Sequence, residues 1–111
     1  MKIDSIKNPT TNKYEITITT KEFTFIGVKN QPDFAELEII YEPADKVIEL
    51  KSYKHYLYEF RNKLMSYESA INIIYDDLIE IYKPNRLVVI MKTNARGGIS
   101  SMLKIDSRWR E

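Results

Sequence analysis

The sequence predicts an α+β fold in which an antiparallel sheet of element order ββααββ carries two helices on one face. Two changes of period in the hydrophobic pattern predict it. Apolar and polar residues alternate along residues 14–20 and 34–41, and apolar residues recur at helical spacing along residues 52–82. A strand-like run that is apolar on both faces then begins at residue 87. We expect residues 1–111 to form a single domain, because no repeat, low-complexity tract or long linker divides them.

Two strands are expected in the first third of the chain. Residues 14–20 alternate strictly, and residues 23–26 add a short apolar stretch before a loop at residues 27–32. The strand pattern resumes over residues 34–41 and stops at Pro43, which has no amide hydrogen to donate to a sheet. Alternation with many β-branched residues is typical of a half-buried strand.

Two amphipathic helices are expected next. The first begins near Ser52, and the second begins near Ser66, with Ser69 as an alternative cap, and ends before Pro84. Both have an apolar stripe with members three and four residues apart, the spacing of one helix face. The stripes are Tyr53, Tyr56, Leu57, Phe60 and Leu64 in the first helix, and Ile71, Ile74, Tyr75, Leu78, Ile79 and Tyr82 in the second.

The last third is expected to return to strand. Residues 87–91 are apolar on both faces, and residues 94–98 form a turn in which two glycines supply positive φ angles. A final strand over residues 99–106 should direct Ile99, among others, toward the helices.

The far face of this sheet is expected to be polar, and its two outer strands to have unpaired edges. Open edges invite pairing with another chain. We therefore expect a homo-oligomer whose subunits close a barrel around a wet lumen. The far-face residues are Glu15, Thr17, Thr19, Glu36, Glu38, Ser100 and Lys104.

Composition excludes several classes of site. The chain has 111 residues, a formal net charge of +1, no cysteine and one histidine, so disulfides, thiolate metal sites and multi-histidine metal sites are excluded. A protein that binds nucleic acid through bulk positive charge is not indicated. Since there is no membrane-spanning run and no secretory signal, we expect a cytoplasmic protein with no membrane partner.

Three segments of the sequence, residues 31–35, 49–56 and 96–100, together with residues 60–62 and Glu68, resemble the QueF family. The second segment fits the family signature E-(S/L)-K-(S/A)-x-K-x-(Y/F/W) at every fixed position. Members of this family reduce 7-cyano-7-deazaguanine with NADPH in queuosine biosynthesis. The resemblance implies the tunnelling fold (T-fold), a ββααββ unit that closes into oligomeric barrels and binds purine-like ligands between subunits.

The resemblance implies that Glu68 binds the base, with Tyr67 at the position of a family histidine and with Glu49 and Leu50 as further substrate contacts. A carboxylate presents two acceptor oxygens to the adjacent ring N–H and amino N–H of a guanine-like edge. The alternative is that Glu68 is a helix N-terminal acid that the helix dipole favours.

The resemblance also implies an NADPH site formed by Lys51, Ser52, Lys54, Arg96 and Gly97. The two lysines are three residues apart and therefore share one side of a helix start, where they can hold phosphates. The alternative is an ordinary solvated basic face.

The catalytic half of the family site differs in this sequence. The matching aspartate, Asp33, handles protons in the family, although it can also be a turn residue that caps its own backbone. The family nucleophile is a cysteine that attacks the nitrile carbon and forms a thioimide. Gly27 or Ile26 occupies its place here, depending on how the shorter loop is matched.

Three functions are compatible with these residues. The first is a 7-cyano-7-deazaguanine-binding protein related to the NADPH-dependent nitrile reductase, with impaired or altered chemistry. The second is a QueF-like amidine-forming enzyme of archaeosine modification, which would meet the base within tRNA or DNA. The third is a non-catalytic module for deazapurine binding or for assembly.

Overall fold

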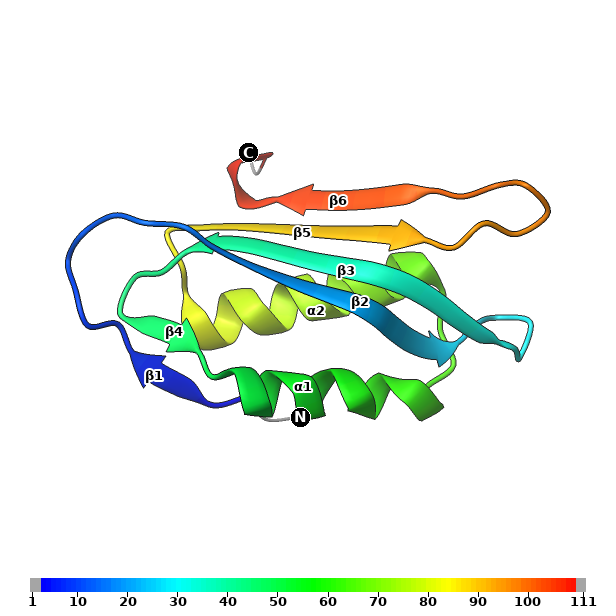
Figure 1. Cartoon of the computed structure of the whole chain (residues 1–111), viewed down its shortest axis with the longest axis horizontal. Helices are drawn as coiled ribbons and strands as arrows, with labels where there is room; N and C mark the ends of the chain where they lie inside the picture. The colour runs from blue at the N-terminus through cyan, green and yellow to red at the C-terminus, as the bar shows by residue number, and fades with distance from the viewer. Residues whose placement is uncertain (1–2, 110–111) are drawn as a thin grey trace.

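A computed structural model describes residues 3–109 of the chain. Its main sheet is antiparallel throughout, with strand order β2-β3-β5-β6. Both helices lie on one face of this sheet (Figure 1). The predicted α+β fold and the order of its main elements are therefore confirmed. The bounds are β2 Ile16–Ile26, β3 Pro32–Glu42, α1 Leu50–Tyr58, α2 Tyr67–Tyr82, β5 Arg86–Thr93 and β6 Met102–Asp106.

Shorter elements complete the chain. Strands β1 (Ser5–Lys7) and β4 (Lys46–Ile48) pair as a separate two-stranded sheet beside the start of α1 (Figure 1). A 3₁₀ turn, η1 (Glu59–Asn62), continues α1, and another, η2 (Ser107–Trp109), follows β6. Across the described residues 3–109, no helix has both the length and the apolar character needed to cross a bilayer.

The two apolar stretches of the first third form one continuous strand, β2, with an irregularity between Thr20 and Phe23. Side chains alternate between the two faces of a strand, so an inserted residue reverses the alternation beyond it. This reversal allows Ile18 before the irregularity and Phe23 and Phe25 after it to face the same core. The bulge explains why strict alternation stops after residue 20.

Helix α1 begins two residues earlier than Ser52. The Glu49 carboxylate caps it by accepting hydrogen bonds from the backbone N–H groups of Ser52 at 2.8 Å and Lys51 at 3.0 Å. The predicted cap of α2 is confirmed, since Ser66 Oγ accepts from the Ser69 N–H at 3.1 Å. These caps satisfy amide groups that have no partner within their helices.

Two side chains expected to face the core are exposed instead. Leu64 is 61% exposed because the helical segment ends at Asn62, before the stripe reaches it. Ile99 is 75% exposed because β6 begins only at Met102. The remaining apolar stripes and inward strand faces pack together between the sheet and the helices.

The turn after β5 has the predicted glycine geometry. Gly97 and Gly98 have φ angles of 57° and 79°, and the flanking Arg96 and Ile99 exchange backbone hydrogen bonds of 2.8 and 3.0 Å. The β5–β6 loop and the β2–β3 loop project from the same end of the sheet (Figure 1). Antiparallel pairing of β3 with β5 therefore brings together residues as far apart in the sequence as Ala35 and Thr93.

Candidate functional site

A cavity of about 180 Å³ lies at the loop end of the sheet. Both strand loops and the first residue of α2 contribute to it. The cavity thus brings together three predicted site residues from separate parts of the chain, along with the position aligned with the family cysteine. It is lined by Gly27, Val28, Lys29, Gln31, Asp33, Tyr67 and Arg96.

The Arg96 guanidinium positions the carboxylate of Asp33. Its Nη2 lies 2.9 Å from Asp33 Oδ1 and also donates to the Pro32 carbonyl at 2.7 Å, while Nη1 donates to Gln31 Oε1 at 3.0 Å. Planar guanidinium groups hold carboxylates in a fixed geometry. The side chain expected to contact a cofactor thus contacts the catalytic candidate within this chain, and Asp33 is only 18% exposed.

The second carboxylate oxygen of Asp33 faces Gly27. A Cβ atom added to Gly27 would overlap Asp33 Oδ2, well inside van der Waals contact. The space that a side chain at position 27 would occupy therefore holds the Asp33 carboxylate. Ile26, the other match to the family cysteine, belongs to β2 and pairs with Pro32.

Tyr67 and Glu68 are adjacent at the start of α2. The Tyr67 hydroxyl donates to the Phe34 carbonyl at 3.4 Å, and its ring meets Phe25 edge-on with centroids 5.2 Å apart. Burial raises the pKa of Tyr67, and the Asp33 carboxylate raises it further, so the phenol keeps its proton at neutral pH. Tyr67 can thus act as a hydrogen-bond donor in the cavity.

The Glu68 side chain is exposed. Within residues 3–109, no lysine, arginine or histidine forms an ion pair with its carboxylate. The Glu68 carbonyl accepts a hydrogen bond from Asn72 Nδ2 at 2.8 Å, but this bond belongs to the helix and leaves the carboxylate free to meet a ligand. The helix dipole favours an acid in this first turn as well.

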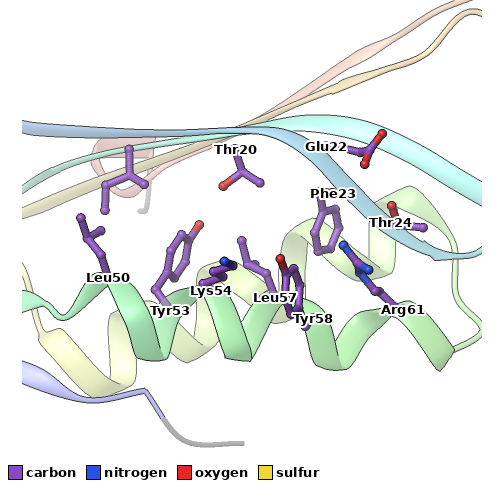
Figure 2. Close-up of a pocket in the computed structure, with 11 residues that line it drawn as sticks. Thr20, Glu22, Phe23, Thr24, Leu50, Tyr53, Lys54, Leu57, Tyr58 and Arg61 are labelled. Atoms are coloured by element: carbon purple, nitrogen blue, oxygen red, sulfur yellow. The ribbon is translucent and has the colours of Figure 1, made fainter.

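A larger groove of about 370 Å³ runs between β2 and α1. Figure 2 shows Lys54 and Arg61 on the helical side and Glu22 on the strand side. The Arg61 guanidinium lies 4.2 Å from the centre of the Tyr58 ring, so the groove has a cationic wall. Sequence reasoning found Lys54 but missed Arg61, whose helical spacing from Lys54 was the available signal.

The groove also contains a polar group without a partner. The Tyr53 side chain is 3% exposed, and among the described residues its hydroxyl finds no hydrogen-bond partner of good geometry. Figure 2 shows this hydroxyl directed toward Thr20 on β2. An unpaired buried hydroxyl is costly unless a ligand or water satisfies it.

Gly97 lies in the turn after β5 next to Arg96. The other predicted residues lie at the start of α1, the end of that helix farther from the loop cavity (Figure 1). Glu49 is used as a helix cap, and the hydrogen bonds from the Ser52 and Lys51 amides lower its pKa. Ser52 Oγ donates to the Glu49 carbonyl at 2.9 Å and accepts from the Asp4 N–H at 2.8 Å. Leu50 and Lys51 are exposed. In a single chain, the predicted site is therefore divided between two places.

Metal binding would require a cluster of side chains that could hold the ion. Across residues 3–109, no group of three or more histidine, aspartate or glutamate side chains is placed to bind a metal ion.

Comparison with known proteins identifies one matching family and several similar proteins that share one name. The profile of a family described as QueF-like protein matches residues 32–111. A curated NADPH-dependent 7-cyano-7-deazaguanine reductase of Thermomicrobium roseum is 42% identical over 103 residues, covering 91% of this chain and 80% of the relative. A reductase of the same name from Chlorobium chlorochromatii is 36% identical over 105 residues, covering 93% of this chain and 90% of the relative. Another, from Chlorobaculum tepidum, is 43% identical over 94 residues, covering 84% of this chain and 80% of the relative.

A solved structure supports the fold assignment. A crystal structure of the archaeosine synthase QueF-Like in its apo form superposes with a TM-score of 0.77, covering 84% of this chain and 92% of that one. Sequence identity over this superposition is 15%, so the likeness concerns the fold.

Proposed function

This chain belongs to the QueF-like family, and on that premise we propose that it binds 7-cyano-7-deazaguanine, the compound in the names of its reductase relatives. The observation that carries the proposal is the unpaired, exposed carboxylate of Glu68, which follows directly after the cavity-lining residue Tyr67 in the first turn of α2. A carboxylate held at a helix start can accept both N–H groups of a guanine-like edge. Bonds of this kind to a charged group contribute roughly 1.5–3 kcal/mol each.

The proposed orientation directs the nitrile into the loop cavity. With the guanine-like edge on Glu68, the five-membered ring of the base would point toward Tyr67 and Asp33. The Tyr67 hydroxyl is a protonated donor and the Asp33 carboxylate is an acceptor. A nitrile carbon is electrophilic and its nitrogen accepts hydrogen bonds, so these two side chains suit its two ends.

NADPH is the proposed second ligand, since the relatives are named as NADPH-dependent enzymes. Lys54 and Arg61 provide cationic charge along the β2–α1 groove for phosphates. The groove volume of about 370 Å³ lies within the usual range of ligand sites. When bound, NADPH supplies a hydride. Lys51 extends the same basic surface at the start of α1.

The chain lacks the group that begins reduction in the family. It contains no cysteine, and Gly27 has no side chain that can attack a nitrile. We therefore propose that base binding is retained while reduction through a thioimide is lost.

A homo-oligomer is the proposed assembly. β2 and β6 form the two edges of the four-stranded sheet and each is paired on one side only within the chain. In addition, the start of α1, with Glu49 and Leu50, and the start of α2, with Tyr67 and Glu68, lie at opposite ends of the helical layer (Figure 1). A base that contacts all four residues requires parts from two neighbouring subunits.

The test is calorimetric titration of the purified chain with 7-cyano-7-deazaguanine and, separately, with NADPH. We expect saturable binding of both compounds, together with no change in nicotinamide absorbance when they are mixed with the protein. Absence of base binding would refute the proposal. Oxidation of NADPH that depends on the base would refute the loss of reduction. Saturable binding of the base without binding of NADPH would refute only the proposed cofactor site.

A further inference from the structure

The loop cavity contains the position of the family nucleophile and holds a candidate base, Asp33, and a candidate acid, Tyr67. Among its described lining residues there is no serine, threonine or cysteine, and its one lysine, Lys29, is exposed. Asp33 places Oδ2 directly against the backbone of Gly27, at the place where a side chain would emerge from residue 27. No hydroxyl or thiol side chain therefore occupies this place, and water is the nucleophile that solvent supplies.

We propose that the chain hydrates a nitrile to a primary amide, with a water molecule as the nucleophile and Asp33 as its general base. The inference rests on the proposed function, because it requires 7-cyano-7-deazaguanine to bind with its nitrile in the loop cavity. It assigns this family scaffold a reaction that needs neither a thiol nor a reductant.

The contacts of Asp33 suit a general base. Arg96 holds Oδ1 at 2.9 Å and thereby fixes the plane of the carboxylate. The opposite oxygen, Oδ2, is directed toward Gly27 and the cavity. Fixed acceptors at hydrogen-bond distance from an attacking water raise rates by about 10²–10⁴-fold. The absence of a Cβ at Gly27 lets this oxygen lie against the backbone there, and an attacking water would approach it from the cavity.

The reaction balances without an added electron carrier. Asp33 Oδ2 takes one proton from water while the water oxygen bonds to the nitrile carbon and one π bond of the C≡N group breaks. The nitrile nitrogen receives a proton from the Tyr67 hydroxyl. The protonated Asp33 then returns its proton to the Tyr67 oxygen through solvent. The resulting imidic acid becomes the amide when its O–H proton moves to nitrogen. The net change is addition of one water molecule.

The experiment incubates the full-length chain with 7-cyano-7-deazaguanine in water enriched in ¹⁸O, without NADPH, and measures the mass of the base. We expect a product heavier by one labelled water. Asp33→Asn, an isosteric change that keeps a polar side chain beside Arg96, should reduce the rate by about 100-fold or more. Asp76→Asn, on an exposed position of α2, should leave the rate unchanged and controls for hydrating enzymes carried through purification.

The outcomes separate this inference from the proposed function. Calorimetric binding of the base to wild-type protein with no gain in mass overturns hydration and leaves binding intact. Absence of binding overturns both. Equal rates for wild type and Asp33→Asn overturn the role of Asp33. Should Asp33→Asn fail to fold, Gly27→Ala gives a second test: its Cβ displaces Oδ2, and we expect a rate loss of at least 10-fold, whereas an unchanged rate contradicts the proposal.

Discussion

Replacing Glu68 by glutamine should weaken binding of 7-cyano-7-deazaguanine at least ~10-fold. Glutamine keeps one acceptor oxygen but turns an amide NH₂ toward a ligand edge that also carries N–H groups. One charged hydrogen bond is therefore lost and two donors face each other. Since Glu68 is exposed in the single chain, we take the lower end of the range for bonds to charged groups, about 1.5 kcal/mol, which corresponds to about 10-fold in Kd.

The assay is calorimetric titration of wild type, Glu68→Gln and Glu80→Gln with the base under identical conditions. Glu80 is an exposed acid near the other end of the same helix, so its replacement should leave the affinity unchanged. Loss of the Glu68 charge from the first turn of α2 should lower the unfolding free energy by only about 0.3–1 kcal/mol. An affinity for Glu68→Gln equal to that of wild type would refute the assigned anchor.

Two further variants examine other parts of the structure. Lys54→Gln should weaken NADPH binding by about 3-fold or more at low salt, and by less at high salt because salt screens this exposed lysine. Lys104→Gln on β6 should leave NADPH binding unchanged. Equal losses of affinity for the two variants in fluorescence titrations would contradict NADPH binding in the β2–α1 groove. Hydrogen bonds from the Arg86 side chain and the Arg108 amide lower the pKa of Asp106 from 3.8 to about 2. Its stabilising contribution is thus present above about pH 4, disappears as the pH falls through about 2, and is at most about 2.5 kcal/mol. Asp106→Asn should therefore flatten the acid limb of thermal unfolding, and an acid limb identical to that of wild type would contradict the assignment.

The main sheet and both helices were predictable because their patterns are long. Sixteen residues of α2 carry an uninterrupted apolar stripe between the Ser66 cap and Pro84. The three-residue strands β1 and β4 were missed, since three residues cannot establish a period of two. The start of α1 was placed late because its cap is Glu49, a residue type uncommon in that role.

The candidate site was predictable in its residues but not in its contacts. Asp33, Tyr67 and Arg96 were selected through a family resemblance, and the loop cavity contains all three. That Arg96 contacts Asp33 depends on the register of β3 against β5, which pairs Ala35 with Thr93. No sequence spacing specifies that register. The unpartnered hydroxyl of Tyr53 was likewise invisible, because its spacing predicts an ordinary core residue.

A crystal structure of the chain soaked with 7-cyano-7-deazaguanine tests the central claim most directly. We expect the base between two subunits, with both oxygens of Glu68 at hydrogen-bond distance from its ring N–H and amino N–H. We also expect the nitrile carbon in the loop cavity beside Asp33. A base bound elsewhere, or a Glu68 carboxylate ion-paired within its own subunit and turned from the ligand, would contradict the account.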